Sequence, residues 1–329
     1  MAEETVWRTR RASIQDRDAL ASLCRSAVGP DDYILRVLDD LLLRNVTFVA
    51  LDDDRIVGSM TYREVFDGSA WLSAARTHPR YRRKGVALAL VRALEGVARM
   101  KGLHALRLWS SASNRAGVAA FTRAGFREVA RFDRIVSDAA RSPTRVSLAR
   151  IALTEDTWSR IEGSPLLART NGYVAHEWAF VPLDRANAHY LSNRGALWGW
   201  GANAVILADA SETFGDDVLE MSPVHGDLRA ILREAPRIAR GRERGRVESF
   251  VPHDEGTLRI AADAGFAPGS WGKEAILCER LLDVAKVVRR VRKTYAEINA
   301  SKRSGYAALA LLAPRGHGHT GPHEDRWNR

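Results

Sequence analysis

The sequence is short of cysteine, lysine and long apolar stretches, and each shortage limits what the protein can be. Cys24 and Cys278 lie far apart and form no motif, which argues against a disulfide scaffold and indicates buried thiols in a reducing cytoplasm. The chain has no run of about 18 apolar residues, so we expect no membrane span. Its first residues, MAEETVWRTRR, include no hydrophobic signal segment, so we expect no export.

Lysine is scarce although the chain is basic. Only six of the 50 basic residues are lysine, and the formal net charge is +10. From Asp283 to the end, 10 basic residues stand against 4 acidic ones, a net charge of +6 for this stretch. Because more than half of the excess charge lies there, we expect no nucleic-acid-binding face on the folded domains.

The most informative stretch is residues 77–101. Three consecutive cations, residues 82–84, precede Gly85, and apolar residues then recur at helical spacing, which predicts a helix from near Gly85 to near Gly102. Cations are unfavourable at the positive end of a helix dipole unless an anion binds between them and the free N–H groups. The small residues Gly85 and Ala87 would let a phosphate approach the backbone. Taken alone, the charges also fit a solvated basic turn.

The order of the neighbouring elements resembles that of the GNAT acetyltransferase superfamily. That family binds acetyl-CoA with a strand, an Arg/Gln-x-x-Gly-x-Gly/Ala loop and a helix. Here a predicted strand at 71–77 precedes the loop, and a second strand at 106–110 follows the helix. The loop itself matches the pattern in full: Arg82-Arg83-Lys84-Gly85-Val86-Ala87. The resemblance covers roughly residues 5–134 well and the rest only partly.

The resemblance implies an acetyl-CoA site made of the strand end, the loop and the next helix, with no metal. A backbone N–H of the strand end would polarise the thioester carbonyl. The implied cofactor-binding residues are Ala75, Arg76, Thr77, Arg82, Arg83, Lys84, Gly85, Val86, Ala87, Asn114 and Phe121. Phe121 stands where the family has a tyrosine that serves as an acid to the sulfur, so this chain lacks that hydroxyl. The segment Val28–Tyr33 would help to select the acceptor.

The sequence assigns no catalytic residue. Glu64, His78 and His104 are candidates for a general base by residue type only, and solvated surface or local capping is the default interpretation for each. The acceptor is expected to be a primary amine on a small molecule or a peptide.

An internal repeat predicts two domains. Ala124-Gly125-Phe126 recurs 140 residues later as Ala264-Gly265-Phe266, and the same offset places Asn114 on Asp254. We therefore expect an α/β (α+β) fold of two tandem GNAT-like domains, residues 1–136 and 144–281, each with a mixed, largely antiparallel sheet flanked by helices. The polar stretch 133–143 predicts a linker between them.

The second domain lacks the cationic loop. The corresponding stretch, 221–227, has no arginine, and the carboxylate of Asp227 would repel a pyrophosphate at the helix start. The sequence thus predicts one acetyl-CoA site in a chain that is a monomer with an internal pseudo-dimer.

The carboxyl-terminal part divides in two. Residues 282–300 predict an amphipathic helix, and residues 301–329 predict a disordered tail. Three histidines of this tail, His317, His319 and His323, lack the surrounding ligands of a metal site.

These patterns favour a cytoplasmic, acetyl-CoA-dependent N-acetyltransferase. Two alternatives stay open at this point: a catalytically silent acyl-CoA-binding sensor, and an interaction module that uses the helix at 282–300.

Overall fold

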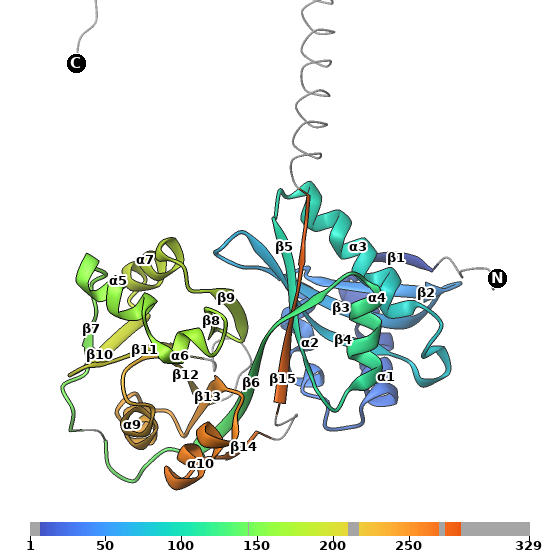
Figure 1. Cartoon of the computed structure of the whole chain (residues 1–329). Coiled ribbons are helices and arrows are strands. Elements are labelled where there is room, and N and C mark those ends of the chain that lie inside the picture. Colours follow the sequence, from blue (N-terminus) through green and yellow to red (C-terminus); the bar gives the residue numbers. More distant parts are fainter. Residues whose placement is uncertain (1–6, 144, 210–216, 270–273, 284–329) are drawn as a thin grey trace, which may run out of the picture. The chain divides into compact units, whose positions relative to one another are not determined.

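The computed structural model describes residues 7–143, 145–209, 217–269 and 274–283, shown in colour in Figure 1. The strands are β1 (Arg8–Arg11), β2 (Thr47–Asp52), β3 (Arg55–Glu64), β4 (Ser69–Thr77), β5 (Ala105–Ser111), β6 (Arg127–Asp138), β7 (Ala149–Arg150), β8 (Tyr173–His176), β9 (Ala179–Pro182), β10 (Leu197–Trp200), β11 (Asn203–Asp209), β12 (Val218–His225), β13 (Arg246–Pro252), β14 (Ala267–Pro268) and β15 (Glu274–Leu281). The α-helices are α1 (Arg17–Ala27), α2 (Ile34–Leu43), α3 (Val86–Met100), α4 (Arg115–Arg123), α5 (Glu155–Glu162), α6 (Pro165–Ala168), α7 (Arg185–Asn193), α9 (Leu228–Gly241) and α10 (Glu255–Asp263). The predicted segments at 282–300 and 301–329 lie, apart from residues 282 and 283, outside the described residues.

One mixed sheet of 13 strands runs through both halves of the chain, in the order β1-β2-β3-β4-β5-β15-β6-β13-β12-β11-β10-β7, with β14 paired to β6. Most neighbours are antiparallel, and the parallel pairs are β4 with β5 and β12 with β13. Helices flank the sheet, and β8 and β9 form a separate hairpin. The expected fold class, a mixed and largely antiparallel sheet flanked by helices, is confirmed.

The two halves exchange strands at the centre of this sheet. Strand β15, the last of the second half, inserts between β5 and β6 of the first half. Strand β6 in turn pairs with β13 of the second half, from Arg246 beside Asp138 to Pro252 beside Phe132. Figure 1 shows β15, in orange, between the green strands β5 and β6. Each half is therefore completed by a strand from the other.

The linker predicted at 133–143 is wrong for its first six residues, because β6 continues to Asp138. Two of the polar side chains that suggest a linker have charged or polar partners inside the sheet. Arg134 forms a buried two-bond ion pair with Glu248 on β13, and the Asp133 carboxylate accepts a hydrogen bond from His253 at 2.9 Å.

Apolar residues at helical and strand spacing build a separate core against each group of helices. α1 and α2 cover β2 and β3 with buried residues such as Leu20, Leu38 and Val49. α9 covers β11, β12 and β13 with residues such as Ile231 and Leu232. The β8–β9 hairpin packs across the exchanged strands through a further set of buried residues: Trp71, Ala130, Phe132, Ala175, Ala179, Phe180, Phe250, Ala275 and Leu277.

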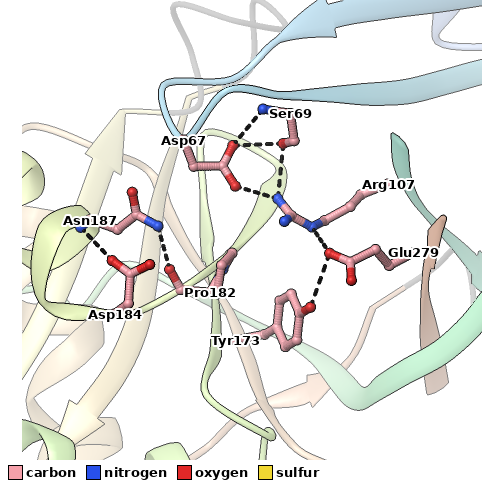
Figure 2. A network of polar contacts seen from close by, with 8 residues as sticks. All are labelled: Asp67, Ser69, Arg107, Tyr173, Pro182, Asp184, Asn187 and Glu279. Atoms are coloured by element: carbon pink, nitrogen blue, oxygen red, sulfur yellow. Dashed lines mark hydrogen bonds and ion pairs between the residues drawn. The ribbon is translucent and has the colours of Figure 1, made fainter. Parts of the chain in front are cut away.

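A buried ion cluster ties the halves together where β5 meets β15 (Figure 2). The Arg107 side chain is 2% exposed and donates to Asp67 and, at 2.6 Å, to Glu279 of β15. Tyr173 of β8 donates to the same Glu279 carboxylate at 3.1 Å, and Arg107 also reaches the Ser69 hydroxyl at 2.9 Å. Burial and the neighbouring Glu279 raise the pKa of Tyr173 to about 12, so its hydroxyl stays a donor.

Among the described residues, no helix is long and apolar enough to cross a membrane.

Replacing Arg107 tests the importance of this cluster. Arg107→Met would leave Asp67 and Glu279 buried without a counter-charge, and we expect the free energy of unfolding to fall by about 3–5 kcal/mol. Arg131→Met is the matched control, because the Arg131 side chain is 44% exposed in its ion pairs and should contribute about 1 kcal/mol or less. Urea denaturation of both variants measures the difference, and equal losses would contradict the assigned role.

Candidate functional site

The predicted anion loop joins β4 to α3. After β4 ends at Thr77, a short 3-10 turn at Pro79–Tyr81 leads to Arg83, at φ 63°, and Gly85, at φ 82°. Gly85 is the N-cap residue of α3 and supplies no side chain to cap it. The first N–H groups of a helix have no partner within the helix. The start of α3 therefore offers backbone donors beside an exposed glycine, as the sequence predicts.

The three cations of the loop are exposed. One guanidinium nitrogen of Arg82 donates to the carbonyl of Ala27, at the end of α1, at 2.9 Å. The Lys84 ammonium lies 5.2 Å from the centre of the Tyr81 ring. The backbone carbonyl of Lys84 accepts a 2.7 Å hydrogen bond from the indole N–H of Trp7. Arg82 thus links the loop to the end of α1, while Trp7 supports the backbone beside Gly85.

Gly58 is a site residue that the sequence argument missed. It lies on β3, directly opposite Thr77. A Cβ atom there would collide with the Cγ1 of Val86, which is buried at the first turn of α3. Glycine at this position lets the helix start approach the sheet. An isolated glycine in a strand pattern is the sequence signal that could have found it.

Strands β4 and β5 separate beside this loop. They pair only from Ser69 beside Ala105 to Trp71 beside Arg107, although both strands continue beyond that point. On its other edge, β4 carries a bulge, since its register with β3 shifts between Thr61 opposite Ser73 and Ser59 opposite Arg76. Within the bulge Ala74 has a φ of 53°, which is uncommon for a residue other than glycine. Bulges re-aim backbone groups, so the predicted carbonyl-polarising N–H falls in a part of β4 with unusual geometry.

Three of the cofactor-binding residues implied by the resemblance, Ala75, Arg76 and Thr77, form the segment from this bulge to the end of β4. Ala75 is exposed and Thr77 is partly exposed, and Arg76 is held by a buried carboxylate, that of Asp32. Asp32 lies in the segment Val28–Tyr33 that the resemblance links to acceptor choice. The side chain of Arg76 is therefore paired with this segment.

Asn114 and Phe121 are contributed by α4. The Asn114 side chain accepts from the Gly117 N–H at 3.1 Å and donates to the Ser110 hydroxyl at 3.3 Å, so it caps α4 and ties it to β5. Phe121 is buried, and its ring meets that of Phe126 edge-on with the ring centroids 5.9 Å apart. Asn114 is exposed, as the loop cations are, whereas Phe121 is not.

The candidates for a general base are dispersed. Glu64 pairs with Ala70, and the His104 N–H donates to the Gly68 carbonyl, so both lie at the start of β4. The loop lies at the other end, after a nine-residue strand that spans roughly 25 Å. His78 does adjoin the loop, but its Nδ1 accepts from the Arg80 N–H at 3.3 Å. Partial burial and nearby arginines lower the pKa of His78, so its ring is neutral at physiological pH.

The second half repeats this arrangement. Asp254 caps α10 as Asn114 caps α4, and Gly265 and Gly125 end the two helices with φ values of 84° and 85°. Asp227 caps α9 by accepting the Arg229 N–H at 3.0 Å, which places a carboxylate where the first half has its loop.

The β8–β9 hairpin covers the place where the strands separate in the second half. β12 and β13 pair only from residue 218 beside 246 to residue 221 beside 249. The hairpin stands between α6 and α7, where the first half has residues 28–33 between α1 and α2. The Trp178 N–H donates to Glu220 of β12 at 2.8 Å, and the Ser222 hydroxyl donates to the Ala175 carbonyl at 2.8 Å. Its ring packing on β13 includes Phe180 against Phe250 at 4.9 Å.

The tip of this hairpin is a two-residue turn with positive φ at both positions, 52° at Glu177 and 60° at Trp178. Such turns favour Asn and Gly, so the bonds from Arg63 to Glu177 and from Trp178 to Glu220 hold a strained conformation. Glu220 is 1% exposed, and burial raises its pKa to about 8. The β8–β9 hairpin thus covers the gap between β12 and β13 in the second half.

Glu220 makes the stability of the folded protein depend on pH. Its pKa in the folded state is raised above the ordinary value, so the folded protein binds one more proton and loses stability as the pH rises from about 4.5 to about 8. Glu220→Gln removes this titration. We expect the variant to gain at least about 1.4 kcal/mol relative to the parent between pH 5 and pH 9, the value of one pKa unit. Urea denaturation across that range measures the gain, and parallel pH profiles would contradict the assignment.

Comparison with known proteins agrees with this geometry. Residues 17–126 match the model of the acetyltransferase (GNAT) family. The fold resembles a proposed acetyltransferase from Thermoplasma acidophilum, with a TM-score of 0.57 and 16% identity over 84% of this chain and 100% of that one. It also resembles a GCN5-related N-acetyltransferase from Sphaerobacter thermophilus, with a TM-score of 0.54 and 14% identity over 84% of this chain and 95% of that one. A search among curated proteins gives no significant match.

Proposed function

We propose that the first half of the chain, whose residues 17–126 match the model of the acetyltransferase (GNAT) family, binds acetyl-CoA and transfers its acetyl group to a primary amine. The observation that carries the proposal is the start of α3, where uncapped N–H groups, Gly85 and three exposed cations adjoin the bulged end of β4. This combination suits a pyrophosphate at the loop and a thioester beside the bulge.

The reaction asks three things of the site. The thioester carbonyl must be polarised, the amine must lose a proton, and the departing thiolate must be stabilised or protonated. The backbone of β4 between Ala74 and Arg76 would supply the polarising N–H. The amine nitrogen then bonds to the carbonyl carbon, the carbon–sulfur bond breaks, and the amine proton leaves to a base or to the sulfur.

We further propose that the two halves are tandem GNAT-like units and that only the first binds acetyl-CoA. The division into domains 1–136 and 144–281 is supported by the repeated capping geometry, although the two units share one sheet. The carboxylate of Asp227 and the docked hairpin support a closed second unit. The acceptor would be a small-molecule or peptide amine. The chain would be a monomer with an internal pseudo-dimer. The buried thiols of Cys24 and Cys278 fit a cytoplasmic protein.

Phe121 favours a second candidate function. Because the family tyrosine is replaced by a buried phenylalanine, the unit could bind acyl-CoA without turning it over, as a sensor. The release of CoA thiol from acetyl-CoA in the presence of primary amines separates the two functions.

Gly85 offers the direct test of acetyl-CoA binding. Gly85→Val introduces a side chain at a φ of 82° and at the predicted phosphate position. Losing even one charge-assisted hydrogen bond of about 1.5–3 kcal/mol weakens affinity roughly 10- to 100-fold. Gly102→Val is the matched control, since Gly102 also has a positive φ, 72°, but lies at the other end of α3. In calorimetric titration with acetyl-CoA, Gly102→Val should bind as the parent does, and unchanged binding by Gly85→Val would refute the site.

Phe121→Tyr tests the missing acid. If protonation of the thiolate limits turnover, the added hydroxyl should raise the rate of thiol release several-fold and leave acetyl-CoA affinity unchanged. Phe126→Tyr is the control, because it adds the same hydroxyl to the neighbouring buried ring. Rates are measured against pH with spermidine, lysine, glucosamine and tryptamine as acceptors. A slower Phe121→Tyr enzyme with an unchanged pH profile would show that another group already acts as the acid.

A further inference from the structure

The segment between α1 and α2 is fastened to β4 by a buried ion pair. Both carboxylate oxygens of Asp32 accept hydrogen bonds from Arg76, from Nε and from Nη2, each at 2.6 Å. The Asp32 side chain is 0% exposed and that of Arg76 is 13% exposed. Asp32 also accepts from the Ile34 N–H at 3.2 Å, which fixes it at the start of α2. A two-bond arginine–carboxylate pair of this kind sets the direction of both side chains.

Arg76 carries this connection into the bulge of β4. Its third guanidinium nitrogen, Nη1, donates to the carbonyl of Ala75 at 3.0 Å, and the guanidinium lies 5.6 Å from the centre of the Tyr33 ring. Burial would lower the pKa of Arg76, but the bonds to Asp32 raise it, so the guanidinium stays charged. A single cation therefore joins a buried carboxylate, an aromatic ring and a bulge carbonyl.

The bulge needs such support. Ala74 and Ala75 stand opposite a single residue of β3, and the φ of 53° at Ala74 is costly for a residue with a side chain. On the other edge, the pairing of β4 with β5 ends at Trp71. Strained backbone persists only where the surroundings hold it, and Asp32 and Arg76 are the charged groups that do so here.

We propose that Asp32 is a positioning residue for acetyl transfer, acting through Arg76 to hold the Ala74–Ala75 bulge so that its backbone N–H faces the thioester carbonyl. This inference rests on the proposed acetyl-CoA site of the first half. It assigns to the segment 28–33 a role in catalysis besides the selection of the acceptor. Asp32 itself touches neither substrate.

The thioester carbonyl reports directly on this role. Acetyl-CoA labelled with carbon-13 at the carbonyl has an infrared stretch that falls in frequency when a hydrogen bond polarises the group. We expect the frequency to fall on binding to the parent protein. In Asp32→Asn, most of that shift should be lost while acetyl-CoA still binds at the loop. Arg76→Lys keeps a charge but cannot make the three directed bonds, so it should lose the shift as well.

The matched control is Glu248→Gln. Glu248 forms a buried two-bond pair with Arg134 in the second half, so this variant removes the same kind of carboxylate away from the bulge. Urea denaturation should show a loss of stability in both Glu248→Gln and Asp32→Asn. Only Asp32→Asn should change the carbonyl frequency.

The outcomes separate this inference from the proposed function. Calorimetric binding of acetyl-CoA by the parent tests the function, and absence of binding would overturn both. If the parent binds and Asp32→Asn keeps the full frequency shift, the inference is wrong and the function stands. A parent that binds without any shift would likewise refute the bulge as the polarising group.

Discussion

The exchange of β15 into the first half is the constraint on which the rest of the structure depends. It brings Glu279 to the buried Arg107 and completes the ion cluster that joins the halves. It also brings Arg280, which donates to the carbonyl of Ala124 at the end of α4 and, at 2.7 Å, to Glu95 of α3. The two helices of the predicted acetyl-CoA site are thus held by a strand that belongs to the other half.

This arrangement explains how a second half without a cationic loop contributes to the protein. Its sheet and hairpin cover the apolar face of the exchanged strands, and its own strand separation is filled by Trp178 and Phe180. Under the proposed function, the second half acts as a rigid support for the first. Acetyl transfer relies on donors held in place before the substrate arrives, so such support is of direct use to the bulge of β4.

The sequence predicted well what local chemistry encodes. The helix start at Gly85 and the carboxylate cap at Asp227 follow from short patterns, and the structure shows both of them. The 140-residue offset that aligns Asn114 with Asp254 joins two residues that the structure shows to be helix caps. Prediction from the sequence failed where residues far apart in the chain come into contact. The polar residues from Asp133 to Asp138 suggest a linker until their partners on β13 are known. For the same reason, neither the strand exchange nor the Asp32–Arg76 pair, 44 positions apart, could be inferred from local spacing.

We propose that this chain, although its two halves are similar, has one acetyl-CoA site, in the first half. The number of ligands bound per chain tests it most directly. Calorimetric titration of the full-length protein with acetyl-CoA should saturate at one equivalent, and desulfo-CoA, which keeps the pyrophosphate, should compete for the same site. Saturation at two equivalents of similar affinity would contradict the account, because the second half would then be open despite Asp227 and the docked hairpin.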